Sequence, residues 1–364
     1  MSHSAAPRSY LRPAALMPSL QTDDSSDLFI RVAGRSDIAA AAAEIIVRMG
    51  TARDEALLLP AAEARERARY ESEIACLLTR HEAPRQPLAG LSLDRPRIMG
   101  IVNVTPDSFS DGGTFASARA AIDHALQLEA DGADILDIGG ESTRPGAEPV
   151  SVEEELRRVL PVIEGLAGRT KALISIDTRK AEVMRRALAA GAHIINDVAA
   201  LTYDAACLEI AARSKAPIIL MHAQGDPRTM QSAPRYGDCL LDVCDWLTAR
   251  IAVCEAAGID RARLVVDPGI GFGKTLTHNL ELLTGLTLLH GLGVPLLLGA
   301  SRKSFIGMLS GTKNAHERLP GSIATALHGA AQGVQILRVH DVAETRQALT
   351  VWESMQRGAP HPST

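Results

Sequence analysis

Short apolar runs recur from residue 96 onward, and a longer amphipathic stretch follows each of them. Eight such runs, rich in Ile, Leu and Val, have the length and composition of buried β-strands. They cover residues 98–104, 135–138, 173–176, 194–196, 218–221, 264–266, 296–298 and 336–339. The stretches between and after them predict helices over 118–130, 152–166, 181–190, 205–213, 240–257, 279–290, 323–332 and 342–355.

Strands that alternate with helices are typical of βαβ units, in which the strands run parallel. Eight units in roughly 260 residues match the usual size of a closed (β/α)₈ TIM barrel. An open doubly wound sheet would more often have a Gly-rich dinucleotide turn after its first strand, whereas here Asn103 and the sequence Thr-Pro-Asp at 105–107 follow it. We therefore predict an α/β fold with a TIM barrel over 96–358 and a short tail over 359–364.

Residues 1–95 lack this alternation. The first 27 residues are rich in Ser, Pro and small side chains, which predicts a disordered tail. The Ala-rich stretch 37–49 and the stretch 61–80 have the composition and apolar spacing of helices. Pro84, Pro87, Gly90 and Pro96 then predict a linker. We expect a mainly helical N-terminal extension without chemistry of its own.

Composition narrows the class of protein further. Only 3% of residues are aromatic, so branched aliphatic side chains must fill the core, as they do inside parallel barrels. The net charge of −5, without a basic stripe, argues against a nucleic-acid partner. No apolar run reaches the ~20 residues that span a membrane. The five cysteines have no metal-ligand spacing and suggest reduced thiols, so we expect a cytoplasmic protein.

Polar and charged side chains gather where the predicted strands end, which is the edge at which barrel enzymes build their sites. Any one of them could be a helix cap or a turn residue. Eight coincident sets cannot all be caps, and charged groups at a barrel mouth need partners or a ligand. The candidates are Asn103, Asp177, Asn196, Asp267, Ser301, Lys303, Arg338 and His340.

These side chains divide by hydrogen-bonding type into two groups. The first combines carboxylate acceptors with amide and amine donors, as a flat heterocycle bearing amino, imino and carbonyl groups requires. It contains Asp177, Asn196, Asp267 and Lys303. The second group, Asn103, Arg338 and His340, suits an anion. An Arg fork matches phosphate oxygens, and an Asn oxygen can bind a hard cation such as Mg²⁺.

The stretches that carry these residues closely resemble the dihydropteroate synthase family of folate biosynthesis. The resemblance runs in order over the whole predicted barrel, whereas residues 1–95 fall outside it. The matching stretches are MGIVNVTPDSFSDGG at 99–113, GGESTRPG at 139–146, IDT at 176–178, HIIND at 193–197, Met221 with His222, Gln224 with Gly225, DPGIGFGK at 267–274, SRKS at 301–304 and RVHD at 338–341.

The resemblance implies that 6-hydroxymethyl-7,8-dihydropterin diphosphate condenses with p-aminobenzoate to give 7,8-dihydropteroate and diphosphate. It implies a pterin site made of Asp177, Asn196, Met221, Asp267 and Lys303, and a diphosphate site made of Asn103, Arg338 and His340, with Asn103 near Mg²⁺. It implies a p-aminobenzoate site made of Thr143, Arg144, Pro145, Phe272, Ser301 and Lys303. It also implies mobile loops that carry Asp107, Ser108, Phe109, Thr143 and Arg144, and a homodimer.

The implied displacement is SN1-like, and the residue types suit it. Cationic groups favour departure of the diphosphate, and Asp177 and Asp267 share the positive charge of the remaining pterin-methyl cation through ring N–H groups. We take Asp177, Asp267, Lys303 and Asn103 as the catalytic candidates. Loops that exclude water would protect the cation until the arylamine attacks it.

Two other interpretations remain open. A methyltetrahydrofolate–corrinoid methyltransferase would share carboxylate and Asn pterin ligands, but it has no need of the diphosphate-binding residues. A catalytically inactive paralogue could act as a binding partner through the N-terminal extension, although each expected catalytic position is filled. Methyl transfer from methyltetrahydrofolate tests the first alternative, and turnover of both synthase substrates tests the second.

Overall fold

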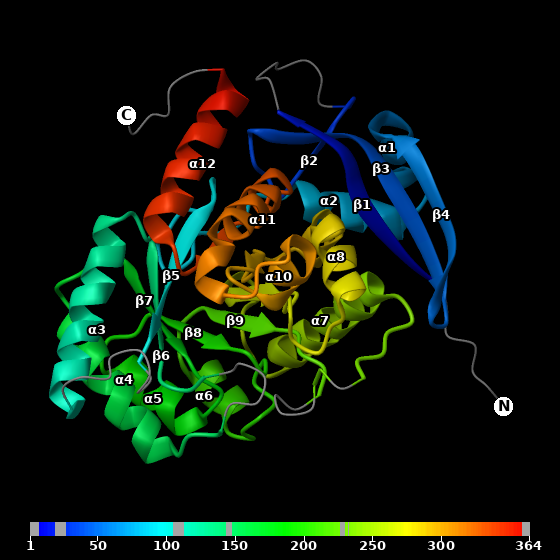
Figure 1. Ribbon diagram of the computed structural model, residues 1–364. Helices are drawn as coiled ribbons and strands as arrows, with labels where there is room; N and C mark the ends of the chain where they lie inside the picture. The colour runs from blue at the N-terminus through cyan, green and yellow to red at the C-terminus, as the bar shows by residue number, and fades with distance from the viewer. Residues whose placement is uncertain are drawn as a thin grey trace.

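The computed structural model describes residues 7–18, 27–104, 113–142, 148–225, 230–231 and 233–358. It consists of a parallel barrel and a smaller N-terminal domain that lies against one side of it (Figure 1). Among the described residues, no helix is both long and apolar enough to cross a membrane.

The barrel sheet confirms the predicted fold class. Its strands are β5 (Arg97–Asn103), β6 (Ile135–Gly139), β7 (Leu173–Asp177), β8 (Ile194–Asp197), β9 (Ile218–Met221), β10 (Leu264–Asp267), β11 (Leu297–Leu298) and β12 (Ile336–Val339). In the described part of the chain these eight strands pair in parallel in the order β10-β9-β8-β7-β6-β5-β12-β11. A parallel bridge between Val266 and Leu296 joins the two ends of this order, so the barrel is closed.

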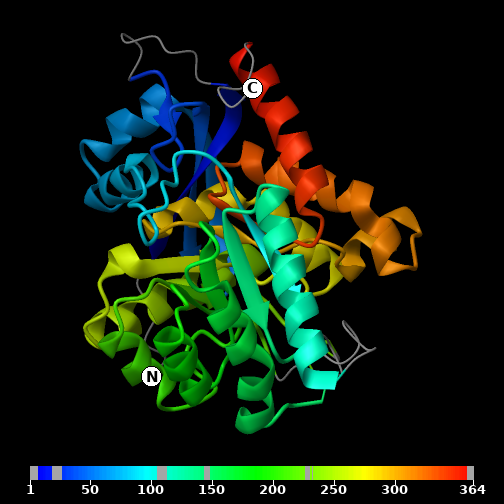
Figure 2. The ribbon, with the colours of Figure 1, turned by 90° about the vertical axis from the view of Figure 1, so that its left-hand side faces the viewer.

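Helices surround the barrel strands (Figure 2). They are α3 (Gly113–Ala130), α4 (Val152–Leu166), α5 (Ala181–Ala189), α6 (Cys207–Arg213), α7 (Cys239–Ala256), α8 (Leu276–Thr284), α9 (Leu286–Leu289), α10 (Ser304–Ser310), α11 (Leu319–Ala331) and α12 (Val342–Arg357). The predicted helix over 279–290 is divided at Gly285, where a Cβ atom would lie 2.3 Å from Leu240 Cδ2. The short helix α10 was not predicted.

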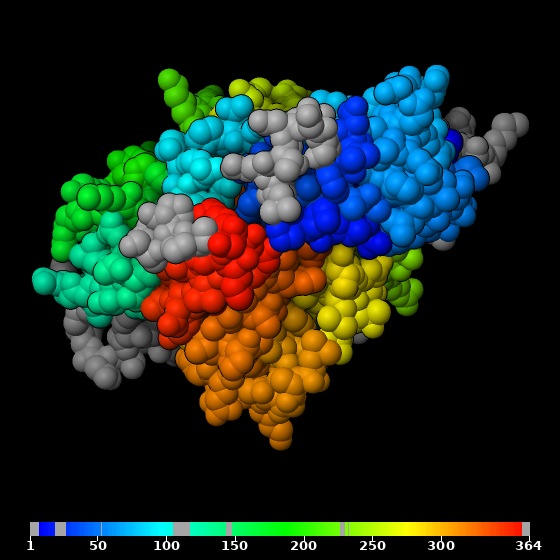
Figure 3. Space-filling view, turned by 90° about the horizontal axis from the view of Figure 1, so that it is seen from above, coloured from blue at the N-terminus to red at the C-terminus, as the bar shows by residue number. Residues whose placement is uncertain are grey.

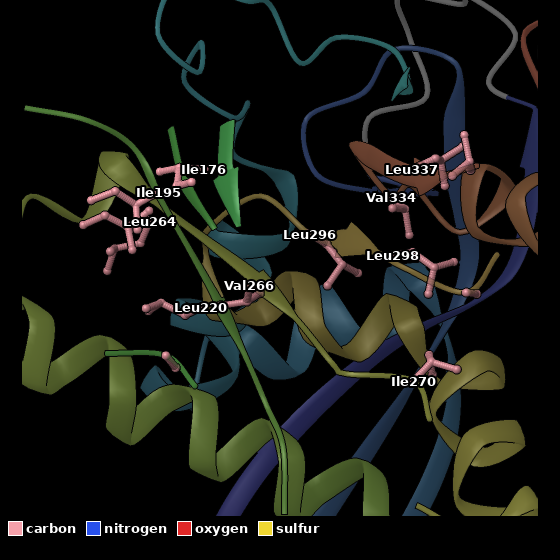
Figure 4. Packing of buried hydrophobic residues seen from close by; sticks show 14 of the residues in the cluster. Ile176, Ile195, Leu220, Leu264, Val266, Ile270, Leu296, Leu298, Val334 and Leu337 are labelled. Atoms are coloured by element: carbon pink, nitrogen blue, oxygen red, sulfur yellow. The ribbon is translucent and has the colours of Figure 1, made fainter. Parts of the chain in front are cut away.

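Alternate residues of each strand face opposite sides of the barrel wall. The outward-facing set, which includes Ile176, Ile195, Leu220 and Val266, packs in the core between strands and helices (Figure 4). A second cluster takes one residue from each of the eight described strands and fills the barrel interior. It consists of Met99, Ile135, Leu173, Ile194, Ile219, Val265, Leu297 and Ile336, with Leu88, Leu91 and Leu93 of the linker.

The N-terminal domain differs from the prediction of a mainly helical extension. It contains β1 (Arg8–Pro18), β2 (Ile30–Arg31), β3 (Ile38–Met49), β4 (Ala52–Pro60), α1 (Ala61–Ala68) and α2 (Ser72–Glu82). Strand β3 pairs antiparallel with β1 on one side and with β2 and β4 on the other. The prediction of helices was right for much of 61–80. It was wrong for 37–49, and disorder was wrong for 8–18.

Tertiary packing explains why the Ala-rich stretch is a strand. Alanine favours helices, but propensity is a weak preference that packing overrides. Strand β3 is buried on both faces: Ile45 packs within the N-terminal domain, whereas the next residue, Ile46, belongs to the core of the barrel. Small side chains such as Ala40 and Ala43, both 0% exposed, allow this close packing. Figure 3 shows the blue N-terminal lobe against the orange and yellow helices of the barrel.

Two buried histidines lie where the N-terminal domain meets the barrel. His81 on α2 bonds through Nε2 to the carbonyl of Leu11 at 2.9 Å, and His290 bonds through Nε2 to the carbonyl of Gln332 at 2.8 Å. Arg85 donates to the backbone oxygen of His290 at 2.9 Å. Burial, reinforced by the nearby Arg85, lowers the pKa of His81 to about 3 and also depresses the pKa of His290. Both imidazoles are therefore neutral in the folded protein at neutral pH.

We expect the His81→Gln variant to lose less stability in acid than the natural protein. The folded-state pKa of His81 lies below the unfolded value, so the unfolded chain binds more protons below pH 6.5 and stability falls as the pH drops. At pH 5 this one group costs about 2 kcal/mol. Urea unfolding at pH 7.5 and pH 5 measures the difference. Exposed His316, changed to Gln, is the control, and equal acid losses in all three proteins would contradict the prediction.

Candidate active site

The site follows from the alternation of side chains along the barrel strands. The residues two positions beyond the interior cluster face the same way and lie nearer to the carboxyl ends of the strands. Three of the eight positions carry a carboxylate or a guanidinium, of which Asp137 and Arg338 are hydrogen-bonded to each other, and a fourth position carries an amide. The full set is Ile101, Asp137, Ser175, Asn196, Met221, Asp267, Gly299 and Arg338. The apolar floor of the barrel thus supports a polar mouth.

Arg338 on β12 connects the polar groups on one side of the mouth. Its Nε donates to Asp137 Oδ2 at 2.6 Å, and its Nη2 donates to Asp177 Oδ2 at 2.7 Å. Asn196 Nδ2 also donates to Asp137 Oδ2, at 3.0 Å. Burial raises the pKa of Asp177, and the attraction of Arg338 opposes this rise. The expected pterin and diphosphate groups are therefore not separate in space, because Arg338 bonds to Asp177, which we expected to hold the pterin ring.

Asp137 is a member of this network that the sequence analysis did not select. Its side chain is 0% exposed, and its Oδ1 atom has no hydrogen-bond partner among the described residues. Ser175 Oγ, on the neighbouring strand, is likewise buried without a partner in the described part of the chain. A signal was present, since Asp137 is a lone charge inside the apolar run Ile-Leu-Asp-Ile. Buried polar atoms of this kind need a donor or acceptor from water or a ligand.

Asp267 and Lys303 form the opposite side of the mouth. Burial raises the pKa of Asp267, and the nearby Lys303 ammonium opposes this effect. Burial lowers the pKa of Lys303 to about 8, so the amine still carries its proton at neutral pH. Its Nζ donates to the carbonyl of Ile270 and lies 4.5 Å from the centre of the Phe272 ring. Gly299 lies between Asp267 and Arg338, where it leaves space that a side chain would fill.

A left-handed residue aligns Ser301 and Lys303 on the same loop. Arg302 has φ +59°, a conformation that costs energy for a side chain with Cβ and is typical of functional turns. Asp341 holds the Arg302 guanidinium, with Nε at 3.0 Å from Oδ2. Ser301 Oγ then meets His340, whose Nδ1 lies 3.0 Å away. The 301–303 and 338–341 stretches therefore lie side by side.

Glycines bring the loop after β10 against the loop after β9. Gly269 and Gly273 have φ +68° and +62°, and a Cβ on them would lie 1.9 Å from His222 O and 2.3 Å from Gln224 O. Lys274 then closes the contact, because its Nζ lies 3.0 Å from both His222 Nδ1 and Phe272 O. Burial lowers the pKa of Lys274 to about 7 and that of His222 to about 3.

Of the remaining predicted site residues, the structure describes some, and the others lie outside the described residues. Met221 ends β9, and its Cγ would lie 3.3 Å from a Cβ on Gly269. Asn103 ends β5 and is half-buried. The predicted mobile-loop and p-aminobenzoate residues Asp107, Ser108, Phe109, Thr143, Arg144 and Pro145 lie outside the described residues. Among the described residues, no cluster of three or more His, Cys, Asp or Glu side chains could hold a metal.

Comparison with known proteins identifies the family. Residues 99–340 match the family described as "Pterin binding enzyme". Over 264 residues, 72% of this chain and 93% of the relative, the chain is 53% identical to dihydropteroate synthase of Escherichia coli strain K12. The chain belongs to the dihydropteroate synthase family.

Solved dihydropteroate synthase structures support the same assignment. The enzyme of Xanthomonas albilineans with 4-aminobenzoic acid is 54% identical and superposes with a TM-score of 0.71, covering 75% of this chain and 98% of that chain. The Xanthomonas albilineans synthase in complex with 7,8-dihydropteroate is 51% identical, with a TM-score of 0.68 and coverage of 75% and 99%. The N-terminal domain precedes the segment matched to the pterin-binding family.

Proposed function

We propose that this chain condenses 6-hydroxymethyl-7,8-dihydropterin diphosphate with p-aminobenzoate, giving 7,8-dihydropteroate and diphosphate. Family membership supports the reaction, since a synthase about half identical to this chain binds 4-aminobenzoic acid in one structure and 7,8-dihydropteroate in another. The observation that carries the proposal is the buried set of Asp137, Asp177 and Asp267 with Asn196 and Lys303 at the barrel mouth.

The described groups can hold a pterin ring by complementary hydrogen bonds. Asp177 and Asp267 can accept from ring and amino N–H groups, and so can Asp137, whose Oδ1 has no partner among the described residues. Lys303 donates to a ring nitrogen or oxygen. Met221 and the space beside Gly299 give the flat ring an apolar surface and room. In this arrangement the carboxylates can stabilise positive charge that develops on the ring.

The displacement follows from this geometry. The bond between the pterin methylene carbon and the diphosphate oxygen breaks, and the electron pair leaves with diphosphate. Arg338 and His340 stabilise that negative charge, so Arg338 exchanges part of its contact with Asp137 and Asp177 for phosphate oxygens. The arylamine nitrogen then bonds to the carbon and loses one proton to solvent or diphosphate. Phe272, Ser301 and Lys303 line the side on which we place p-aminobenzoate.

Mg²⁺ fits this site as a partner of the diphosphate. Mg²⁺ commonly binds through one or two protein oxygens together with substrate phosphates, so a preformed cluster of ligands is not required. The amide oxygen of Asn103, half-buried at the end of β5, is the protein ligand that we propose. When bound, the ion would neutralise charge on the leaving diphosphate.

A direct assay tests the proposed function. The full chain, supplied with the pterin diphosphate, p-aminobenzoate and Mg²⁺, should release diphosphate and form dihydropteroate only when both organic substrates are present. A sulfonamide should compete with p-aminobenzoate. Methyl transfer from methyltetrahydrofolate to a corrinoid protein, or no turnover with intact binding, would instead support the methyltransferase or the inactive paralogue.

We expect Gly299→Val to fold but to bind the pterin at least about 10-fold more weakly. A Cβ at position 299 would lie 3.6 Å from Asp267 Oδ2 and 3.9 Å from Arg338 Cβ, which are ordinary contacts. The added methyl groups would then occupy ring space, and lost contacts of about 1.4 kcal/mol correspond to tenfold in affinity. Calorimetric titration with the pterin measures this, and Gly299→Ala, which adds only the Cβ, is the matched control.

A homodimer and a cytoplasmic location are also proposals. Exposed apolar side chains on α10 and α12, including Met308 and Met355, offer surface to a second copy. Light scattering on the purified chain measures the oligomeric state. Microscopy of a tagged full-length chain tests the location.

A further inference from the structure

A stripe of carboxylates on α7 joins the barrel to the N-terminal domain. Asp238, Asp242 and Asp245 are three to four residues apart, so they lie on one side of the first turns of α7. Arg53 forms an ion pair with Asp238, and Arg48 pairs with both other carboxylates, at 3.2 Å from Asp245. Tyr10 Oη lies 2.9 Å from Asp245 Oδ1. The acidic stripe is therefore neutralised by another domain.

Backbone contacts fix the turn between β3 and β4 against the residue that precedes this helix. A Cβ on Gly237 would lie 2.4 Å from the carbonyl oxygen of Thr51, so the two backbones touch. Arg48 Nη2 donates to that same carbonyl at 3.2 Å. Asp242 Oδ2 accepts from the Gly237 amide at 2.8 Å. The Arg48–Asp242 pair thus binds both residues of the contact, Thr51 through Arg48 and Gly237 through Asp242.

Tyr236, which precedes Gly237, connects this contact to the active site. Tyr236 Oη donates to the carbonyl of Gly273 at 2.9 Å, and its ring packs edge-on against His278 with centroids 4.8 Å apart. Gly273 stands between Phe272, whose ring faces Lys303, and Lys274, which closes the contact with His222. Three consecutive residues, 236 to 238, therefore connect the N-terminal domain to the loop on which we place p-aminobenzoate.

We propose that the N-terminal domain acts as a brace for the loops after β9 and β10, and so sets the geometry of the p-aminobenzoate pocket through Arg53 and Tyr236 as positioning residues. The assignment of the pocket to p-aminobenzoate rests on the proposed function. The brace itself rests on paired contacts. The side chain of Arg53 is 30% exposed and that of Asp238 is 8% exposed. Loss of the Arg53 side chain would therefore leave a largely buried carboxylate without its cation. The loop after β9, which ends at Tyr236 to Asp238, would then lose its fixed end.

Steady-state kinetics on the full chain separates a brace from a merely structural contact. Arg53→Ala and Tyr236→Phe should each raise KM for p-aminobenzoate by about 10-fold, in the range that remote coupled residues reach. KM for the pterin diphosphate and kcat should stay within about twofold, because β7, β8 and β12 are untouched. Arg53→Lys should restore part of the loss. Arg69→Ala removes an exposed ion pair of the same domain and is the matched control.

A double-mutant cycle and hydrogen exchange complete the test. The two substitutions should be non-additive when combined, because they interrupt the same line of contacts. In the absence of substrates, amide exchange at residues 271–275 should rise in Arg53→Ala and not in Arg69→Ala. Unchanged exchange there, or an equal rise in KM for both substrates, would overturn the brace. A natural protein that makes no dihydropteroate while Arg53→Ala still loosens these amides would overturn the proposed function alone.

Discussion

Replacing Lys303 with alanine is expected to lower kcat/KM by about 10²–10³-fold, the range found when one preorganised electrostatic group is removed from an active site. Lys303 lies beside Asp267 and over the Phe272 ring, so it borders both the proposed pterin site and the p-aminobenzoate pocket. Its removal would leave the buried Asp267 without the cation that most strongly stabilises its charge. Initial rates with each substrate varied in turn measure the loss.

The control for this variant is Lys313→Ala, because Lys313 is an exposed lysine ten residues further along the chain. It should retain full activity. The pH profile adds a second readout. The pKa of Lys303 is lowered to about 8, so activity of the natural protein should decline as the pH rises through that value. Lys303→Arg, whose guanidinium keeps its proton, should lack this decline, and an active Lys303→Ala variant would remove Lys303 from the site.

Arg338→Met is expected to destabilise the folded protein by about 3–5 kcal/mol at pH 8, because breaking a buried ion pair leaves an uncompensated charge. The side chains of Asp137 and Asp177 are 0% and 9% exposed, and both accept from Arg338. Urea unfolding measures this loss. Turnover should fall as well, because the proposed partner of the leaving diphosphate is absent.

The pH dependence of this variant has a defined sign. Burial already raises the pKa of Asp177 above its unfolded value, and loss of Arg338 removes the attraction that opposes this rise. A group with a raised folded-state pKa is favoured by acid, so the stability deficit of the variant should be largest at and above pH 8, where Asp177 of the natural protein ionises, and smaller at pH 5.5. Asp177→Asn in the same chain should relieve part of the loss. An unchanged unfolding free energy would contradict the observed pairing.

Periodicity was sufficient to predict the barrel, because its eight strands repeat one pattern and each is buried by its neighbours. The residues at the strand ends were found for the same reason, since Asp177, Asn196 and Asp267 interrupt apolar runs at their boundaries. Asp137 was not selected, because it lies within a run and its role depends on Asn196 and Arg338, which are distant in sequence. A single sequence read locally does not reveal such pairings.

The N-terminal domain shows where local patterns fail. The Ala-rich stretch has the composition of a helix, yet pairing with β1 and β4 and burial on two faces make it a strand. The acidic spacing of Asp238, Asp242 and Asp245 could have indicated a basic partner, but nothing local to α7 specifies that Arg48 and Arg53 supply it. Long-range packing decides both features.

The two-faced burial of β3 has a consequence for the order in which the chain matures on the ribosome. The barrel residues that cover the N-terminal domain include Thr287, which donates to the carbonyl of Pro13, and Gly291, which packs against His81. They are synthesised more than 270 residues after Pro13. Strand β1 is therefore completed late although it is synthesised before the barrel, and the nascent chain must carry Tyr10 and Ile46 uncovered until most of the barrel exists.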